Sequence, residues 1–525
     1  MTDPNAELAL ADQLLDQSDA SGALDHTLRA KEQLSSQAQP SPILLGHLAG
    51  RLIDCGSVFR RPDLVLEGLA ILESRFDELK QEIQEASLHC NIGNAKQSLY
   101  DFDGSRAQQG FNPAAITTLI EAKNAYWKAF RVSDGSDPQL FVNLANCLDR
   151  SSRVVEALRC YDLALTVTPG FAMAELNRGM ALQTLNEIAG VYTISLLLEA
   201  LRSFRAAEAG NLPPHLREAA RHQRVRTESV LTRLGWSEDR AREYDEQHRL
   251  EADAHDPYWR FCLDNFLALS EHALYCRCVG ARRDDLSIPK PTGSIAGEFV
   301  PRLELLLNRM KSEFCLARAL YYQATRAPGQ WDLESFEGTF SELHEGEEIG
   351  LSSEFLRTSF RLCFGILDRI AQGVSELYAL AEPEEALYFE SFWRPAHQRN
   401  KGEERWTKIN QQNNWGLVAL YSIATDLNTK GGEWGFFKKH RNSLEHGLLV
   451  LTGDSGGVPA LARPERILLE ELTFAAFAEQ TLYMLQLTAS AIFSFVFCAR
   501  AEGVRSLGEG PAIRMTMDKK DIGKD

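Results

Sequence analysis

The sequence lacks the features of an exported, disulfide-stapled protein. Its ten cysteines include no CxxC pair and follow no even spacing, which disfavours a secreted disulfide scaffold and indicates a reducing compartment. The first residues, MTDPNAELALADQLLDQ, carry acids where a signal peptide has positive charge followed by an apolar run. We therefore expect a cytoplasmic protein.

Several familiar motifs are missing as well. The chain has no GxxxxGK[ST] loop, no GxSxG elbow and no HExxH sequence, so P-loop nucleotide hydrolysis and serine esterase chemistry lose their main signals. His272, Cys276 and Cys278 lie close together, but no fourth metal ligand is near them in the sequence. Cysteines packed in a helical core are the favoured interpretation. We expect no metal and no cofactor.

The chain has fewer basic than acidic residues. Lys and Arg number 56 against 73 Asp and Glu, giving a net charge of −17. This balance argues against a protein that coats nucleic acid, although a local basic site on an acidic body stays open. The apolar fraction of 44% is typical of a folded soluble protein, and 525 residues suffice for two to four domains.

Strand signals are scarce, whereas apolar residues at three- and four-residue spacing recur along the chain, so the predicted fold class is all-α. One stretch without charge, from Leu482 to Cys498, approaches the length of a membrane helix. Polar residues recur inside it and acids flank it closely. We therefore favour a buried core or dimer-interface helix over a membrane span.

A 34-residue unit that begins at Pro138 carries an apolar pattern typical of helical repeats. Small residues allow two antiparallel helices to approach closely, large ones fill the groove between them, and a proline ends the second helix. These positions are Leu144, Ala145, Leu148, Ala157, Tyr161, Ala164 and Pro169. The unit resembles the tetratricopeptide repeat, and weaker copies lie on both sides, around Gly93 with Tyr126 and around Gly179 with Phe204.

Since single repeats cannot bury their own faces, several must stack, and such arrays bind proteins or peptides. We expect a regulator of this kind on the array. The predicted organisation is a repeat array over 1–215, a helical connecting region with an acidic linker over 216–350, a helical domain over 351–505 and a polar tail over 506–525. In the third part we expect helices over about 353–380, 415–427, 436–451 and 464–501.

The segment FFKKHRNSLEHGLLVL contains an Arg-x4-His motif, formed by Arg441 and His446. Asn442 follows the Arg and stands four residues before the His, on the same helix face. The spacing alone is weak, because Arg217 and His222 repeat it.

The surroundings of the motif distinguish it from this other copy. Between 392 and 442 the chain has nine Lys or Arg against four acids. Tryptophans are interleaved with these charges, which suits contact with phosphates and unstacked bases. The alternative is that the aromatic side chains belong to the core and the cations are merely solvated. The tryptophans are Trp393, Trp406, Trp415 and Trp434.

Residues 353 to 505 resemble the HEPN superfamily, in the branch where a tetratricopeptide array precedes the HEPN domain. The resemblance rests on FRLCFGILDRIA, FESFW, NWGLVALYSIATDLN and RNSLEHG. It implies a metal-independent endoribonuclease whose site forms between two protomers. His446 would then be the general acid or base, Arg441 would hold the phosphate, and Asn442 and Asp368 would be polar site residues. We expect RNA contacts from Lys438, Lys439, His440 and Arg394.

Two hypotheses follow. The first is a homodimeric ribonuclease, acting as a bacterial toxin or antiviral effector under control of its repeats. The second is a non-catalytic adaptor that binds proteins through the repeats and dimerises through the HEPN domain; it predicts Arg441 and His446 buried in internal salt bridges. Glu445, four residues after Arg441, either pairs with that Arg or weakens phosphate binding.

Overall fold

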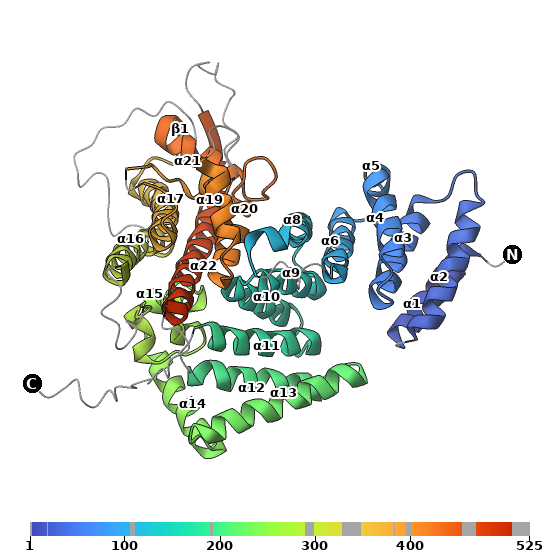
Figure 1. Ribbon diagram of the computed structural model, residues 1–525, viewed down its shortest axis with the longest axis horizontal. Helices are drawn as coiled ribbons and strands as arrows, with labels where there is room; N and C mark the ends of the chain where they lie inside the picture. Colours follow the sequence, from blue (N-terminus) through green and yellow to red (C-terminus); the bar gives the residue numbers. More distant parts are fainter. Residues whose placement is uncertain are drawn as a thin grey trace, which may run out of the picture. The chain divides into compact units, whose positions relative to one another are not determined.

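A computed structural model describes residues 3–17, 19–104, 111–189, 193–288, 299–327, 348–382, 384–394, 401–453 and 469–506. The protein is mostly helical, as predicted, and divides into two compact units (Figure 1). The repeat unit comprises residues 1–186, 193–243 and 421–436, and the C-terminal unit comprises 187–192, 244–420 and 437–525. Most of the predicted acidic linker and nearly all of the polar tail lie outside the described residues.

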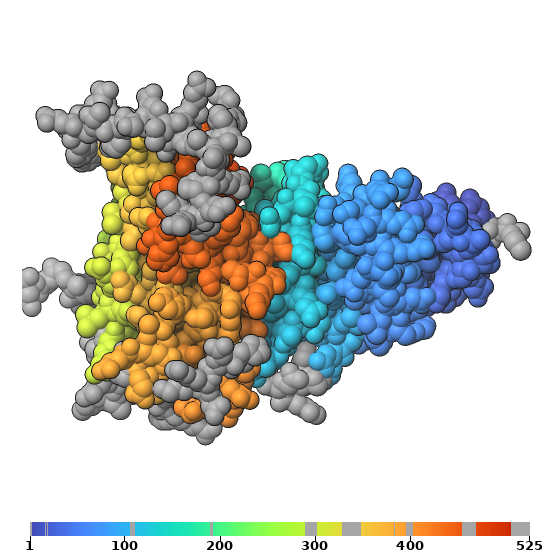
Figure 2. Space-filling view, turned by 90° about the horizontal axis from the view of Figure 1, so that it is seen from above, coloured from blue at the N-terminus to red at the C-terminus, as the bar shows by residue number. Residues whose placement is uncertain are grey.

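The repeat unit consists of helices that pack in antiparallel pairs, with α3 on α4, α6 on α8, α9 on α10 and α12 on α13. In the space-filling view, α1 to α8 form one continuous packed body, coloured blue to cyan (Figure 2). Proline opens several of these helices, at the position where its missing N–H costs nothing. The helices are α1 (Pro4–Asp16), α2 (Ala20–Ser35), α3 (Pro42–Val58), α4 (Pro62–Ser74), α5 (Phe76–Leu79), α6 (Glu85–Phe102), η1 (Pro113–Ile116), α8 (Thr117–Val132), α9 (Pro138–Arg150), α10 (Val154–Val167), α11 (Ala172–Ile188), α12 (Ile194–Ala209) and α13 (Pro214–Arg233). Helix α14 (Glu238–Asp253) begins in this unit and continues into the C-terminal unit from Tyr244.

Close approach of a small residue to a large ring explains the pairing. A Cβ atom on Gly93 would lie 2.6 Å from the Tyr126 ring, and one on Gly179 would lie 2.6 Å from the Phe204 ring. In the repeat that begins at Pro138, the predicted small and large positions within the two helices are all buried. The tetratricopeptide pattern is therefore confirmed for the helices of this repeat, and the same contact of glycine with an aromatic ring recurs at Gly93 and Gly179.

The C-terminal unit is centred on three mutually packed long helices, α16, α17 and α22. Here too a glycine permits close packing, because a Cβ on Gly373 would lie 2.6 Å from the Phe495 ring. The elements are α15 (Pro257–Asp264), η2 (His272–Leu274), η3 (Val279–Arg283), α16 (Phe299–Arg326), α17 (Leu351–Tyr378), α18 (Phe389–Phe392), α19 (Lys401–Asn410), α20 (Trp415–Asp426), α21 (Phe436–His446), β1 (Leu448–Thr452), β2 (Leu469–Thr473) and α22 (Phe474–Ser506).

Helix α22 contains the long uncharged stretch. Its segment Phe474–Gly503 is long and apolar enough to cross a membrane, with a mean hydropathy of 1.7 over its most apolar part. However, 89% of that part is buried inside the protein. Thr481, Thr488 and Ser494 each donate a hydrogen bond to the carbonyl four residues earlier, so their hydroxyls are satisfied within the helix. In this structure α22 is a core helix.

The predicted helix over 436–451 is wrong in its second half. Helix α21 ends at His446, and the apolar run after Gly447 forms β1, which pairs in parallel with β2 in the register Leu448 to Leu469. Short apolar runs fit a helix or a strand equally well, and here pairing with a distant segment decides. The start of the predicted helix from 464 lies outside the described residues up to 468; residues 469–473 form β2, and α22 begins at Phe474.

The repeat unit contains a fully buried ion network. Lys123 Nζ lies 2.6 Å from Asp426 Oδ1, and Arg153 pairs with both Asp426 and Glu156. Lys123 also donates to the carbonyl of Ser422 at 2.6 Å. Burial lowers the pKa of Lys123 to about 8, against the opposing effect of the Asp426 carboxylate. Two cations thus share one carboxylate away from water.

We predict that Asp426→Asn destabilises the repeat unit by about 3 to 5 kcal/mol, because it leaves Lys123 buried without its counter-charge and takes from Arg153 one of its carboxylate partners, while the pair with Glu156 remains. Urea unfolding followed by circular dichroism measures the loss. Asp63→Asn, which breaks an exposed pair with Arg61, is the control and should destabilise the unit far less, because water screens this pair. Equal effects of the two substitutions would contradict the prediction.

Candidate functional site

Helix α21 presents the Arg-x4-His motif with one face inward and one outward. Phe437, His440 and Leu444 are buried, at the spacing of an amphipathic helix. Asn442 and His446 are exposed. The apolar residues thus fix the rotation of the helix about its axis and leave the polar part of the motif at the surface.

Arg441 is held by α17 and α18. Its guanidinium lies 3.2 Å from Asp368 Oδ2, and rests over the rings of Phe364 at 5.4 Å and Tyr388 at 5.9 Å. The other oxygen of Asp368 accepts a hydrogen bond from Phe389 N at 2.8 Å. Burial raises the pKa of Asp368, although this hydrogen bond and Arg441 oppose the shift. With 28% of its side chain exposed, Arg441 is oriented and still accessible.

His446 is the last residue of α21 and is exposed. Among the described residues it makes no hydrogen bond or ion pair. It stands five positions after Arg441 on the helix, which places the two about 140° apart around the axis and about 7.5 Å apart along it. Asn442, four residues before His446, lies only about 40° away from it. Asn442 and His446 therefore share a face, and Arg441 lies on the flank.

The cations around the motif are paired with acids that lie outside the basic stretch of the sequence. Lys438 Nζ lies 2.5 Å from Glu390 Oε2, and Arg394 pairs with the same carboxylate. Lys439 lies 3.1 Å from Glu470 on β2. Burial, together with the positive charges of Arg394 and Arg441, lowers the pKa of Lys438. Much of the local excess of positive charge is thus balanced by the fold.

His440 lies in the core rather than at the surface. Its exposed fraction is 3%, and its ring packs near Phe360, Phe437 and Phe477. His440 Nδ1 lies 2.9 Å from Glu470 Oε2. Burial would raise the pKa of Glu470, but His440 and Lys439 outweigh it and lower the pKa. In this position His440 links α21 to β2 and is shielded from an RNA strand.

The tryptophans divide between core and surface. Trp393 and Trp434 are buried, as the alternative interpretation of the aromatic residues expects. Trp406 is half-buried, whereas Trp415 is 47% exposed. Trp434 belongs to the repeat unit, where it packs against Trp127 with ring centroids 5.6 Å apart. The buried tryptophans of this stretch therefore serve core packing, and Trp415 is the most exposed of the four.

Glu445 does not pair with Arg441. Its carboxylate lies 3.6 Å from Arg361 on α17, and Arg361 also donates to the carbonyl of Leu444. Sequence reasoning missed the residues that hold the motif. Phe364 stands one helical turn before Asp368, and this spacing could have identified it. Tyr388, Glu390 and Glu470 come from other elements, and no local pattern points to them.

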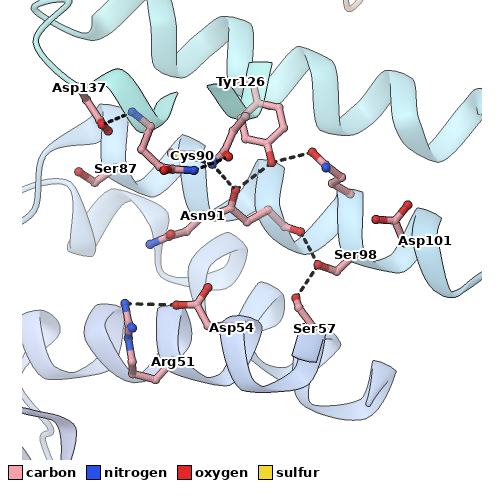
Figure 3. A pocket seen from close by; sticks show the side chains of 14 residues that line it. Arg51, Asp54, Ser57, Ser87, Cys90, Asn91, Ser98, Asp101, Tyr126 and Asp137 are labelled. Atoms are coloured by element: carbon pink, nitrogen blue, oxygen red, sulfur yellow. Dashed lines mark hydrogen bonds and ion pairs between the residues drawn. The ribbon is translucent and has the colours of Figure 1, made fainter. Parts of the chain in front are cut away.

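A second candidate site is a polar pocket of about 540 Å³ in the repeat unit. Tyr126 donates hydrogen bonds to Asn94 Oδ1 at 2.8 Å and to Gln97 Oε1 at 3.0 Å, and Asn143 donates to Asn94 at 3.0 Å. Figure 3 shows Tyr126 among the side chains that line the pocket, which come from neighbouring helices. The pocket is lined by Arg51, Asp54, Ser57, Ser87, Cys90, Asn91, Asn94, Gln97, Ser98, Asp101, Tyr126, Asp137, Gln139 and Asn143.

Comparison with known proteins gives one family match and similarity to a solved structure. Residues 296–502 match the family described as LA2681-like HEPN. A solved tetratricopeptide repeat protein of Thermus thermophilus is similar over 44% of this chain and 100% of its own, with 17% identity and a TM-score of 0.32. No curated protein matches the sequence significantly. Residues 296–502 are therefore similar to an LA2681-like HEPN domain, and the helical repeats described above precede them in the chain.

Proposed function

We propose that the protein is a metal-independent endoribonuclease. HEPN domains are frequently ribonucleases. The observation that carries the proposal is the arrangement on α21: an exposed imidazole at His446 and an oriented, accessible guanidinium at Arg441, both on one rigid helix. The resemblance of the motif to other HEPN proteins supports the same roles.

The chemistry needs only proton transfer and charge stabilisation. The 2′-oxygen of a ribose attacks the neighbouring phosphorus, the bond from phosphorus to the 5′-oxygen breaks, and a 2′,3′-cyclic phosphate is left. One group takes the proton of the 2′-hydroxyl and another gives a proton to the leaving 5′-oxygen. An imidazole such as His446 transfers protons near neutral pH. A guanidinium such as Arg441 stabilises the dianionic phosphorane with two hydrogen bonds.

The site would be shared by two copies of the chain. One His446 does not supply both the base and the acid of the same step, and it points about 140° away from Arg441 around the helix. A two-fold pairing of the α21 surfaces would bring two histidines and two arginines to one phosphate. We therefore include a homodimer in the proposal.

The acidic residues around the motif orient Arg441 and reduce the net positive charge of the site. Asp368 turns Arg441 toward its position, so a phosphate would take the free edge of the guanidinium. Lys438, Lys439 and Arg394 keep their carboxylate partners and give a weak, salt-sensitive attraction to the RNA backbone. Asn442 would add a neutral hydrogen bond beside His446.

We expect His446→Ala to lower the rate of RNA cleavage at least about 100-fold, because the general acid or base is lost. Cleavage of tRNA and mRNA in gels, with detection of 2′,3′-cyclic phosphate ends, measures the effect. His222→Ala is the matched control, since Arg217 and His222 have the same spacing outside this site, and it should cleave normally. RNA left intact by the wild-type dimer, or equal activity of both variants, would refute the ribonuclease.

Asp368 is a positioning residue in this proposal. We expect Asp368→Asn to lower kcat about 10- to 100-fold, because Arg441 loses its orientation. The KM should change little, and Asp368→Glu should recover part of the activity. Glu313→Gln, which breaks the ion pair with the neighbouring Arg369, is the control. An Asp368→Asn enzyme as active as the wild type would remove Asp368 from the site.

In the cell, we propose that this cleavage arrests growth, as a toxin or an antiviral effector in the cytoplasm, under control of the repeat unit. Induced expression of the wild type should stop the growth of a bacterial host, whereas the His446→Ala protein at equal abundance should not. Equal growth with both proteins would refute this role without refuting the cleavage chemistry.

The polar pocket favours a second function, the binding of an extended peptide by the repeat unit. Side-chain amides offer both donors and acceptors, which suits a peptide backbone. Peptides selected by phage display on the wild type should bind at least about tenfold more weakly to Asn91→Ala and Asn143→Ala, a loss of about 1.4 kcal/mol. Gln17→Ala, at the exposed end of α1, is the control. Unchanged affinity in both pocket variants would exclude the pocket.

A further inference from the structure

Four metal-ligating side chains meet outside the HEPN motif. His248 lies on α14, His272 lies in η2, and Cys276 and Cys278 lie in the loop that follows. All four belong to the C-terminal unit. Their ligand atoms lie within 4.8 Å of one another. The sequence places three of them close together, and the fold supplies the fourth from a residue 24 positions before His272.

The imidazoles are oriented toward the sulfurs. His272 Nε2 lies 2.8 Å from Cys278 Sγ. His248 Nδ1 lies 2.5 Å from the carbonyl of Tyr244 and donates to it, so Nε2 is the atom left for a metal. A backbone carbonyl on the second nitrogen is the usual partner of a metal-bound histidine, because it fixes the tautomer and the ring.

The two cysteines are buried and receive hydrogen bonds. Their exposed fractions are 4% for Cys276 and 9% for Cys278. Cys276 Sγ accepts from Cys278 N at 3.4 Å and from the hydroxyl of Tyr244 at 3.5 Å. These contacts hold the Cys276 sulfur in place beside Cys278, and a metal ion would bind both sulfurs as thiolates.

The loop that carries the cysteines is fixed to α14 by contacts independent of the cluster. Val279 N donates to Glu251 Oε2 at 2.9 Å. His255 Nε2 lies 2.7 Å from the carbonyl of Arg277, and Arg282 donates to the other nitrogen of His255 at 2.7 Å. The ligands are thus brought together by the fold itself, which reduces the cost of organising a site.

We propose that His248, His272, Cys276 and Cys278 bind one zinc ion in a closed, tetrahedral, structural site. Two thiolates and two imidazoles are a typical zinc ligand set, and the two thiolates neutralise the charge of the ion. Tetrahedral zinc requires ligand atoms about 3.3 to 3.8 Å apart. Ligand atoms that lie up to 4.8 Å apart would therefore approach one another slightly, and His272 Nε2 and Cys278 Sγ, now 2.8 Å apart, would separate slightly. With four protein ligands the ion has no open position, so it would join α14 to the loop and take no part in RNA cleavage.

Elemental analysis of the full-length protein, purified without metal-affinity resin, tests the site. We expect about one zinc per chain in the wild type. Cys276→Ser and His248→Ala should lose it. Cys90→Ser and His222→Ala, which change the same residue types elsewhere, should keep it.

Cobalt substitution of the wild type tests the geometry without relying on the variants to fold. Cobalt added to the chelator-treated protein should give the visible bands of a tetrahedral ion and a thiolate-to-cobalt charge-transfer band in the near ultraviolet. Wild-type protein without stoichiometric metal and without these bands would overturn the proposal. A disulfide between Cys276 and Cys278 in the protein purified under reducing conditions would overturn it as well.

Discussion

The buried pairing of Lys123 and Arg153 with Asp426 is the constraint on which the repeat unit depends. Removing three charged groups from water is costly, and the cost is recovered only when each finds its partner. Asp426 is the last residue of α20, which lies within the HEPN match, yet residues 421–436 belong to the repeat unit. The repeat unit therefore completes its own core with residues from far along the chain.

The same physical principle shapes the surroundings of the HEPN motif. Cations that the sequence groups together are paired with acids from other elements: Lys438 with Glu390, Lys439 with Glu470, and Arg441 with Asp368. The side chain of His446 is exposed and has no such partner among the described residues. The adaptor hypothesis predicted both Arg441 and His446 buried in salt bridges, and the structure shows this pairing, partly exposed, for Arg441 only. Electrostatic attraction to RNA would thus be modest, and orientation of Arg441 would carry more of the chemistry.

The cluster of His248, His272, Cys276 and Cys278 combines three residues that are close in sequence with one from a distant helix. Three ligands in seven residues, without a fourth, point to a helical core. The region is less helical than its apolar runs suggest: α15 ends at Asp264, and Phe266 has a positive φ of 58°. The resulting loop returns to α14, where His248 completes the set. In the zinc proposal, a histidine on a polar helix thus becomes the fourth metal ligand.

The sequence by itself determined what depends on short-range periodicity. The all-α class, the repeat that begins at Pro138, and helices close to α17 and α20 follow from apolar spacing and from small residues at the helix contacts, because each helix buries one stripe. Arg441 and His446 were found by spacing and resemblance. Tertiary structure alone decided the rest: the strands β1 and β2, the burial of His440, the acids that pair with the cations, and the fourth ligand beside the cysteines. Each of these depends on contacts between residues distant in the chain, and such contacts leave no pattern in the neighbouring residues.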